Sequence, residues 1–424
     1  MPCGVEPEPS GADNTGGRSE GKITTVETPA KPAKRRVDDL RAAVLVLVCV
    51  LAVSCTGRSP PVSEPDQQPV SAWPTRGWRT AAPQDQGMDP RALAGIDDEA
   101  RLVFPALRSV LVVRHGVLVV ERYYHGATPA TYFNVYSVTK SVTSALIGIA
   151  LGDHTLAGLD QRVGRLLIKH LPARPDPRIR NVTVEQVLTM TAGLPPDPPG
   201  GAPPSLVRTA DWVRFVLSQH PVTKPGTRFA YSGAGSHLLS AIIAEATGQP
   251  TLRYAQAKLF APLGIASDPA FEPEFAPSNA AAYERAGFAW PTDPQGYHLG
   301  YGLLKLTARD MAKIGYLYLK GGTWEGRQVV PAAYVRASTQ TQTQVPTGGT
   351  FGPFNGYGYQ WWTATEQGHR AFAAIGLGGQ LIEVIPDLDL IVVMTSELTT
   401  AEDVRTGGES HKLVGHVVIP AVRD

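Results

Sequence analysis

Short β-rich runs lie near both ends of the folded part of this chain, and helical patterns fill the middle. At the near end, Asp89-Pro90 places an N-cap before a proline at the first helical position, so we expect a helix through about Leu102. The runs Val110–Val113 and Val117–Tyr123 are separated by three residues that include a glycine, which predicts a β-hairpin.

The far end of the chain contains three further β-rich runs, with a turn expected at Pro386-Asp387. These strands are expected at Ala371–Ala374, Gln380–Ile385 and Leu390–Thr395. The helices expected between the two ends are Ser137–Leu151, Val184–Met190, Thr209–Leu217, Ser236–Ala246 and Ala308–Leu319. Two early and three late strands predict one antiparallel sheet completed by both ends of the chain, an α/β (α+β) fold. The helical middle would cover one face and form a lobe, with a site in the cleft between sheet and lobe.

The helix expected over Ser137–Leu151 carries apolar side chains nearly all the way round, which predicts that it is buried. One polar stripe interrupts the apolar surface, because Ser137, Lys140, Ser141 and Ser144 follow one another at i, i+3, i+4 and i+7. A buried lysine is costly unless it is paired or acts as a neutral amine, and burial favours the neutral form. A neutral Lys140 could accept the proton of Ser137, so the two residues have the composition of a nucleophile and its base.

The Ser-x-x-Lys motif alone is weak evidence, because a second copy begins at Ser19 in the polar leader. Ser137 also fits an N-cap serine, and Lys140 fits a surface lysine whose stem lies along apolar groups. Tyr231 precedes the helix expected over Ser236–Ala246, where its hydroxyl could relay a proton. The alternative for Tyr231 is packing against the start of that helix.

A glycine-rich segment, Gly376–Gln380, leads into a late strand. Glycines there would let the backbone approach a substrate closely, and a backbone N–H could bind an oxyanion. The alternative is a bulge or bend of the strand.

These three elements, in this order, resemble the serine β-lactamase and penicillin-binding-protein superfamily. Within it, the chain is similar to the class C β-lactamase-related esterases and 6-aminohexanoate-dimer hydrolases. The resemblance extends from about Arg79 to Val417. Further segments that support it are Leu188–Leu194, Thr307–Lys313 and Gly356–Trp362.

The resemblance implies a β-lactamase/transpeptidase-like fold, with an antiparallel sheet flanked by helices and an inserted, mainly helical lobe. It implies Ser137 as the acylated nucleophile, Lys140 as its base and Tyr231 as the proton relay, although the superfamily leaves the identity of the acylation base disputed. It also implies an oxyanion hole built by the Ser137 N–H and a late-strand N–H. We assign the latter to Leu377, with Gly378 beside it.

Two departures from the superfamily pattern bear on the substrate. Gly233 stands two residues after Tyr231, where many relatives have Asn, and the late-strand Lys-Thr-Gly that holds a β-lactam carboxylate is absent. Both departures favour neutral ester or small amide substrates over β-lactams. Trp290, Trp361 and Trp362 could form a pocket wall for such substrates, although core packing is the commoner role of tryptophan in this setting.

The N-terminal part of the chain predicts export. Residues 1–36 are polar and predict a disordered leader, and residues 37–55 have the apolar core and small-residue end of a secretory signal. Leu51–Cys55 resembles a bacterial lipobox, in which Cys55 would carry lipid. Residues 56–74 are rich in proline and predict a tether, which leaves 75–424 as the hydrolase domain. We therefore expect a lipoprotein on the outer face of the cytoplasmic membrane, with a short uncleaved anchor as the alternative.

Composition excludes several other classes of protein. The 424 residues carry a formal net charge of +1, which offers no basic face for nucleic acid. The three cysteines, Cys3, Cys49 and Cys55, all precede residue 56, so the folded part has no cysteine nucleophile and no cysteine-based metal site. His411 and His416 are badly spaced for one helical face, and no carboxylate completes a site with them. We expect no metal and no cofactor.

The leading hypothesis is a serine hydrolase that cleaves ester or small amide bonds through an acyl-enzyme on Ser137. A D-alanyl-D-alanine carboxypeptidase or a β-lactamase is the alternative among enzymes. A non-catalytic cell-wall binding or sensor domain is the alternative from another class. The presence of Ser137, Lys140 and Tyr231 together argues against a pure binding domain, which needs no base beside its serine.

Overall fold

The computed structural model describes residues 73–198, 204–269, 274–346, 351–398 and 409–423. Every described residue belongs to one compact unit of the chain, residues 66–424. The leader, the signal with Cys55 and the tether as far as residue 72 lie outside the described residues. The packed fold already includes Trp73, whose ring lies against the rings of Tyr316 and Trp324.

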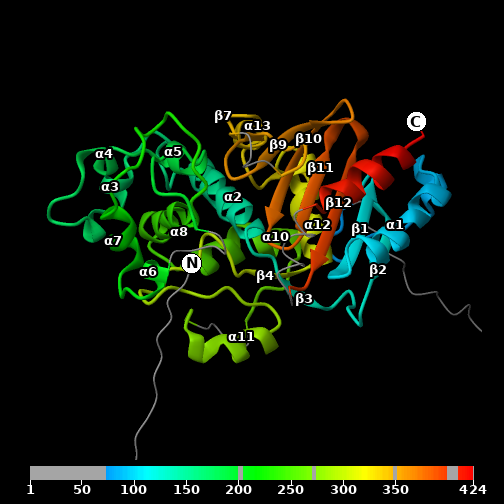
Figure 1. The fold of residues 1–424 in the computed structure, drawn as a ribbon, viewed down its shortest axis with the longest axis horizontal. Helices are drawn as coiled ribbons and strands as arrows, with labels where there is room; N and C mark the ends of the chain where they lie inside the picture. The colour runs from blue at the N-terminus through cyan, green and yellow to red at the C-terminus, as the bar shows by residue number, and fades with distance from the viewer. Residues whose placement is uncertain (1–72, 199–203, 270–273, 347–350, 399–408, 424) are drawn as a thin grey trace, which may run out of the picture. The chain divides into compact units, whose positions relative to one another are not determined.

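One antiparallel sheet of eight strands forms the centre of the fold, and strands from the two ends of the chain are adjacent in it (Figure 1). The strand order is β2-β1-β12-β11-β10-β9-β8-β7. Their bounds are β1 Leu107–Arg114, β2 Val117–Tyr123, β7 Thr343–Gln344, β8 Gly356–Tyr357, β9 Trp362–Glu366, β10 His369–Gly376, β11 Gln380–Ile385 and β12 Leu390–Ser396. The predicted hairpin, the three late strands and their union in one sheet are confirmed. Strands β7, β8 and β9 extend the sheet beyond the predicted five.

The two faces of the sheet are covered by different helices because successive strand residues point to opposite sides. In β1, Leu111 and Val113 belong to the core formed with α2 (Val138–Gly152) and α12 (Ala308–Leu319). Val110 and Val112 belong to the core on the other face, which is formed with the two terminal segments of the domain.

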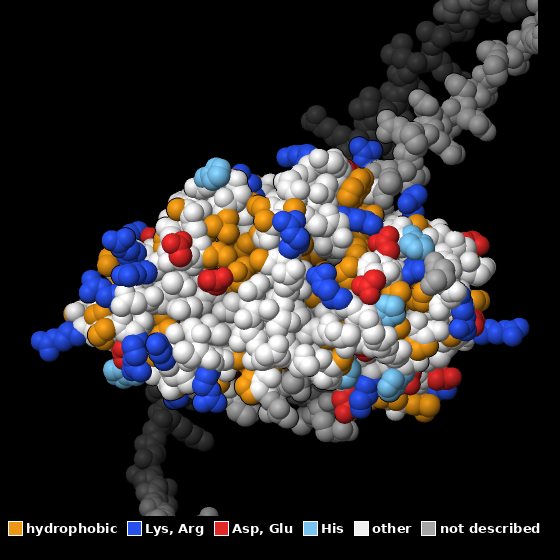
Figure 2. Space-filling view, turned by 90° about the horizontal axis from the view of Figure 1, so that it is seen from above, with side chains coloured by type: hydrophobic (Ala, Val, Ile, Leu, Met, Phe, Trp, Pro, Cys, Tyr) orange, Lys and Arg blue, Asp and Glu red, His pale blue; other side chains and the backbone are white. Residues whose placement is uncertain are grey.

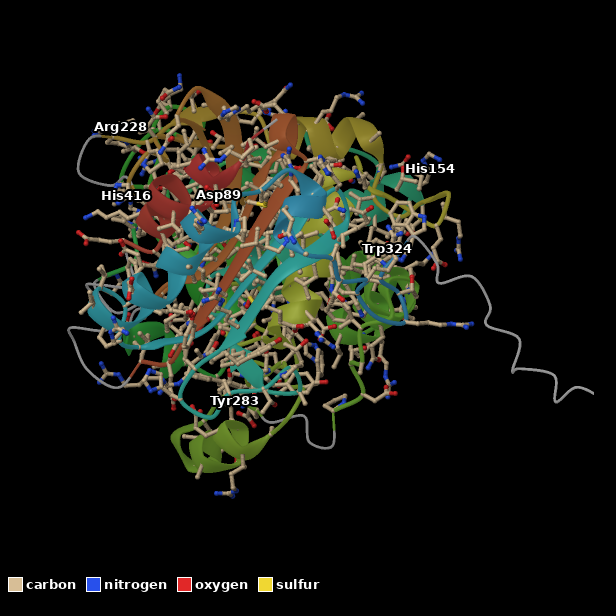
Figure 3. The ribbon with its side chains drawn as sticks, turned by 90° about the vertical axis from the view of Figure 1, so that its right-hand side faces the viewer. Asp89, His154, Arg228, Tyr283, Trp324 and His416 are labelled. Atoms are coloured by element: carbon tan, nitrogen blue, oxygen red, sulfur yellow. The ribbon has the colours of Figure 1, made fainter. Side chains whose placement is uncertain are left out.

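Those terminal segments lie side by side against the sheet, as Figure 3 shows near Asp89 and His416. They are α1 (Pro90–Leu102) and a run of short helical pieces, α15 His411–Leu413, η6 Val414–Val418 and η7 Ile419–Ala421. Asp89 caps α1 as predicted, since its Oδ1 accepts the Arg91 N–H at 2.8 Å. The Asp89 N–H donates to the Ala421 carbonyl at 2.7 Å, which joins the two segments.

The middle of the chain folds into the predicted helical lobe, with α8 packed against α2, α5 and α7 (Figure 1). Its helices are α3 Val163–Leu166, α4 Pro177–Arg180, α5 Val184–Leu188, α6 Pro204–Val207, α7 Trp212–Leu217, α8 Gly233–Thr247, α9 Thr251–Ala255, α10 Ala261–Leu263 and α11 Ala280–Arg285. The helix α13 (Ala332–Ser338) follows α12. Short 3₁₀ or π segments occur at η1 Pro83–Gln86, η2 Ile168–His170, η3 Gln256–Phe260, η4 Pro277–Asn279 and η5 Pro386–Leu388.

Two small strand pairs complete the fold: β3 (Tyr132–Asn134) with β4 (Lys305–Thr307), and β5 (Thr323–Trp324) with β6 (Arg327–Gln328). The pair β3–β4 bears on the site, because β3 leads into α2 and β4 follows the segment that lies beside Lys140. Neither pair was predicted, since strands of two or three residues leave almost no alternation to detect.

Helix boundaries differ from the prediction where a polar side chain caps the first turn. Helix α8 begins at Gly233 rather than Ser236, because the Ser232 hydroxyl accepts the Gly235 N–H at 3.2 Å. Helix α7 begins at Trp212 rather than Thr209, because Asp211 accepts the Arg214 N–H at 2.7 Å.

Basic and acidic side chains are interspersed with apolar and uncharged surface on the face shown in Figure 2. This mixture agrees with the formal net charge of +1. Within the part of the chain that the structure describes, none of the helices has the length and apolar composition needed to span a bilayer.

Candidate active site

Ser137 is presented by a tight turn between β3 and α2. Tyr136, the residue before it, has φ +46° and thus lies in the left-handed region that non-glycine residues rarely adopt. The Asn134 side chain holds this turn by accepting the Tyr136 N–H at 2.9 Å. Ser137 stands at the N-cap of α2, but its hydroxyl makes no capping hydrogen bond. The hydroxyl is therefore available to Lys140, one turn along the helix.

Lys140 is buried, with 3% of the residue exposed, so it is not a surface lysine. Its Nζ lies 2.8 Å from the Ser137 Oγ and donates to the Tyr301 carbonyl at 2.8 Å. A carbonyl oxygen can only accept, so the contact with Tyr301 uses an N–H of Lys140. In a neutral amine, that contact leaves the lone pair free to take the proton of Ser137.

The other two members of the polar stripe have a structural part. The Ser141 hydroxyl donates to the Gln360 carbonyl and the Ser144 hydroxyl donates to the Tyr359 carbonyl, both at 2.7 Å. These bonds tie α2 to the connection between β8 and β9. Ser137 and Lys140 therefore face the site, whereas Ser141 and Ser144 fix the helix.

Tyr231 lies beside Lys140, whose Nζ is 4.9 Å from the centre of the tyrosine ring. The ring stacks on Trp362, with centroids 5.9 Å apart and planes inclined by 21°. The neighbouring Ala230 N–H donates to the Met190 carbonyl at 2.8 Å, which fixes the turn before α8. Tyr231 therefore packs on an aromatic neighbour and also lies close to the lysine.

The turn between β10 and β11 lies beside the segment that leads into Ser137. A Cβ on Gly376 would come within 2.4 Å of the Val135 carbonyl oxygen, so only glycine permits this approach. Leu377 follows in the turn with 39% of the residue exposed, and Gly378 has φ +76°. The glycine-rich segment thus lies beside the residues that lead into Ser137, and the assignment of Leu377 to the oxyanion hole stays a prediction.

The three tryptophans expected at a pocket wall have different places. Trp361 is fully buried between the rings of Tyr318 and Phe372, with centroids 4.4 and 5.4 Å away, so its assignment to the substrate pocket is wrong. Trp290 is also fully buried and donates its Nε1–H to the Leu299 carbonyl at 2.9 Å. Trp362, 3% exposed, lies at the site through its stacking on Tyr231.

Gln360 joins three elements behind the site and was not predicted. Its side chain donates to the Leu188 carbonyl at 2.8 Å and accepts the Ser236 hydroxyl at 2.9 Å. Its own carbonyl accepts from Ser141, and its φ is +61°. The sequence contains Gln360 within Gly356–Trp362, but nothing there shows that this side chain connects α2, α5 and α8.

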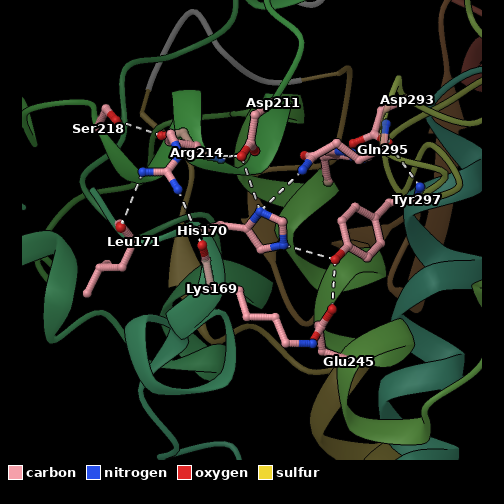
Figure 4. A network of polar contacts seen from close by, with 11 residues as sticks. Lys169, His170, Leu171, Asp211, Arg214, Ser218, Glu245, Asp293, Gln295 and Tyr297 are labelled. Atoms are coloured by element: carbon pink, nitrogen blue, oxygen red, sulfur yellow. Dashed lines mark hydrogen bonds and ion pairs between the residues drawn. The ribbon is translucent and has the colours of Figure 1, made fainter. Parts of the chain in front are cut away.

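The segment that carries Tyr301 is anchored through a buried hydrogen bond. The Asp293 Oδ2 lies 3.0 Å from the His237 Nε2, and both side chains are fully buried. The Asp293 Oδ1 accepts the Tyr297 N–H at 2.9 Å. Figure 4 shows how this segment continues into a surface network, in which the Tyr297 hydroxyl lies 2.9 Å from the His170 Nε2 and donates to Glu245 at 2.8 Å. His237 thus supports the segment of Tyr301 from within the core.

Asp197 is a further titratable group near the lysine that was not predicted. Its Oδ2 accepts the Gly233 N–H at 2.7 Å. Burial raises the pKa of Asp197 above its ordinary value, and the charge of Lys140 and the bonds from the first amides of α8 act in the opposite direction. Burial, followed by the charge of Asp197, raises the pKa of Tyr301 as well.

A metal centre finds no support among the described residues, where no group of three or more His, Cys, Asp or Glu side chains is arranged to hold an ion.

Residues 100–415 match the Beta-lactamase family. The chain belongs to the β-lactamase family. The resemblance inferred from Ser137, Lys140, Tyr231 and the glycine-rich strand is thereby confirmed. The matched residues make up well over half of the chain, and they include every proposed catalytic position.

Known relatives differ in their chemistry. The chain is 26% identical over 352 residues to the 6-aminohexanoate-dimer hydrolase of Paenarthrobacter ureafaciens, covering 77% of this chain and 82% of that protein. It shares its fold with EstCE1, a hydrolase with promiscuous acyltransferase activity, at TM-score 0.60 and 19% identity, over 79% of this chain and 98% of that one. It shares its fold with a class C β-lactamase from Rhodobacter sphaeroides at TM-score 0.55 and 19% identity, over 78% of this chain and 100% of that one. Membership in this family of hydrolases is therefore established, and the bond that this member cleaves is a separate question.

Proposed function

We propose that the protein hydrolyses ester or small amide bonds through an acyl-enzyme on Ser137. The observation that carries this proposal is the 2.8 Å contact between the Ser137 Oγ and the Nζ of the buried Lys140, with Tyr231 beside them. A nucleophile within hydrogen-bond reach of a base, which is itself oriented by a third group, is the arrangement that covalent hydrolysis needs. Here the third group is the Tyr301 carbonyl.

In the first step, neutral Lys140 takes the Ser137 proton while the Oγ bonds to the carbonyl carbon of the substrate. The negative charge that develops on the substrate oxygen is stabilised by the Ser137 and Leu377 backbone N–H groups. The proton then passes to the leaving alcohol or amine, with the Tyr231 hydroxyl as relay. Loss of that group leaves Ser137 acylated.

In the second step, water attacks the acyl carbon and gives one proton to the same basic group. The acid is released and the Ser137 Oγ regains its proton. Every group used lies at the junction of α2, the turn before α8 and the β10–β11 turn, so no large rearrangement is needed between the steps.

The surroundings of the site favour uncharged acyl groups. Phe351 and Tyr357 contact the ring of Trp362, with centroids 4.8 and 5.0 Å away, and Trp362 stacks on Tyr231. From Gly321 to His411 the sequence contains no lysine to hold the carboxylate of a β-lactam. We therefore prefer esters and small amides to β-lactams and D-alanyl-D-alanine peptides.

The test is hydrolysis of p-nitrophenyl butyrate by the purified full-length protein, compared with Ser137→Ala and Lys140→Ala. Each variant should lose at least about 10²-fold in kcat/KM with an unchanged melting temperature. The matched control is Ser144→Ala on the same helix, which removes a hydroxyl that bonds to the Tyr359 carbonyl and should keep most of the activity.

Either active-site variant with near-wild-type turnover would refute the mechanism. If wild-type protein fails on the ester but opens nitrocefin or releases D-alanine from a peptide, the alternative enzyme classes replace this proposal. Failure on all three, together with no covalent labelling of Ser137 by a fluorophosphonate, would favour the non-catalytic binding domain.

We also propose that Cys55 is lipidated and holds the protein at the outer face of the cytoplasmic membrane. The support is the lipobox-like Leu51–Cys55 behind an apolar run, followed by a proline-rich stretch. The change Cys55→Ala should release the protein from the membrane fraction, while Cys49→Ala, inside the apolar run, should not. Equal membrane retention of both variants would contradict lipidation.

A further inference from the structure

Asp197 is bonded to both sides of the turn that positions Tyr231. Its N–H donates to the Tyr231 carbonyl at 2.9 Å, and its Oδ2 accepts the Gly233 N–H at 2.7 Å. The two bonds bracket Tyr231 and Ser232, the residues that connect the site to the start of α8. The conformation of this turn therefore depends on Asp197.

The carboxylate of Asp197 occupies the volume that a side chain at position 233 would take. A Cβ on Gly233 would come within 2.7 Å of the Asp197 Oδ2 and 3.4 Å of the Tyr301 Cβ. Gly233 is thus more than a departure from the pattern of the relatives. Because Gly233 has no side chain, the Asp197 carboxylate can occupy this volume.

The electrostatic surroundings connect this carboxylate to the lysine. Burial raises the pKa of Asp197, and the charged form of Lys140 acts in the opposite direction; burial, and after it the negative charge of Asp197, raises the pKa of Tyr301. Tyr301 is also the residue whose carbonyl accepts from Lys140 at 2.8 Å. Asp197 therefore acts on the lysine through its charge and on the turn beside it through two hydrogen bonds.

We propose that Asp197 is the positioning residue of the Ser137–Lys140 pair. Its carboxylate holds the turn of Tyr231 and stabilises the ammonium that Lys140 becomes when it takes the proton of Ser137. The lysine gains this proton as the Ser137 Oγ bonds to the substrate carbonyl carbon, and loses it to the leaving group. This inference rests on the proposed acyl-enzyme mechanism, and it adds a charge that the mechanism itself does not require.

The test separates the charge from the hydrogen bond, using the full-length protein. Asp197→Asn keeps an acceptor for the Gly233 N–H but removes the charge, and kcat should fall about tenfold or more with KM nearly unchanged, because the positive charge that develops on Lys140 during acylation then lacks its counter-charge. Asp197→Ala removes both interactions and should lose more.

Two double variants place a new side chain in the same volume. Asp197→Ala with Gly233→Asp restores a carboxylate from position 233, and should recover much of the lost kcat. Asp197→Ala with Gly233→Asn restores a side chain of the same shape without charge, and should recover less. Melting temperatures report whether each variant folds, and Asp197→Asn, which is isosteric, keeps the test valid if the alanine variants unfold.

Failure of this proposal can be told apart from failure of the proposed function. The rate at which a fluorophosphonate labels Ser137 measures the reactivity of the serine even if p-nitrophenyl butyrate proves a poor substrate. Wild-type kcat and labelling rate in Asp197→Asn would overturn the proposal while leaving the serine mechanism intact. Equal recovery by the Gly233→Asp and Gly233→Asn doubles would show that shape and not charge matters, and would overturn it too. A wild-type protein that is not labelled at Ser137 would instead remove the proposed function.

Discussion

Glu383 lies fully buried in β11, and its replacement by glutamine should change how the stability of the protein depends on pH. It points to the same side of the sheet as Leu381 and Ile385, toward the C-terminal helical pieces. Glu366, at the end of β9, is its acidic neighbour, and a Cβ on Gly415 would come within 2.5 Å of the Glu366 Oε1. Burial, and after it Glu366, raises the pKa of Glu383 well above its ordinary value near 4.5.

A raised pKa in the folded state makes stability fall as the pH rises. Below about pH 4.5 the carboxyl is protonated in both states, and its contribution is fully present. Above that pH the unfolded chain releases the proton while the folded protein keeps it, until the pH reaches the folded-state pKa. Over this window each pH unit costs about 1.4 kcal/mol, a noticeable part of the roughly 5–15 kcal/mol that stabilises a typical protein.

The measurement is urea unfolding at several values of pH from 5 to 8, comparing wild type with Glu383→Gln. Glutamine does not titrate, so the free energy of unfolding of the variant should fall less steeply with pH than that of wild type. The absolute stability of the variant is not diagnostic, because the buried amide needs its own hydrogen-bond partners. The matched control is Glu397→Gln, whose side chain is 60% exposed and paired with Arg108, and which should keep the wild-type slope. Parallel slopes for wild type and Glu383→Gln would refute the reasoning.

Three further predictions concern the site and its support. Tyr231→Phe should lower kcat by about 10²-fold while Ser137 still reacts with a fluorophosphonate, and an unchanged kcat would return Tyr231 to a packing role on Trp362. Gly376→Ala should lower the free energy of unfolding by about 1–3 kcal/mol and impair turnover, because the new methyl group would meet the Val135 carbonyl; Gly287→Ala, whose methyl group would meet nothing nearer than 3.6 Å, is the control. Thr307→Ala should lower the free energy of unfolding by about 1 kcal/mol, since Thr307 caps α12 by accepting the Asp310 N–H at 3.1 Å, and thermal unfolding with no shift would contradict that role.

The sheet was predictable because its strands carry strong local signals. The run Val117–Tyr123 and the strand Gln380–Ile385 were located to the residue, since β-branched side chains fill them and turn residues bound them. Strands β7 and β8 have two residues each and contain Gly, Thr, Gln and Tyr in no alternating pattern, so their place in the sheet depends on the tertiary fold alone.

The candidate site was predictable only where a local motif exists. Ser137 and Lys140 share one helical turn, so their contact follows from helix geometry. Tyr301 contacts the lysine and Asp197 acts on the surroundings of the lysine from segments with no sequence relation to α2. One contributes a backbone carbonyl, which any residue could supply, and the other is one aspartate among many. Trp361 was wrongly assigned to the substrate pocket because the sequence does not show which of two adjacent tryptophans points into the core.

Strained backbone around the site explains why local rules fail there. Tyr136, Met190, Leu303 and Gln360 all have φ between +46° and +63°, although none is a glycine. Each such residue costs on the order of 1–3 kcal/mol, so it persists only where the surroundings hold it. Tyr136 precedes the nucleophile, Met190 accepts the Ala230 N–H beside Tyr231, Leu303 follows Tyr301 by two residues, and Gln360 receives the Ser141 bond. These strained residues therefore fix the turn of Ser137, the turn before α8 and the segment of Tyr301 around Lys140. A pair that must already be aligned when a substrate arrives benefits from such rigidity, and the packed cores on the two faces of the sheet supply the stability that maintains it.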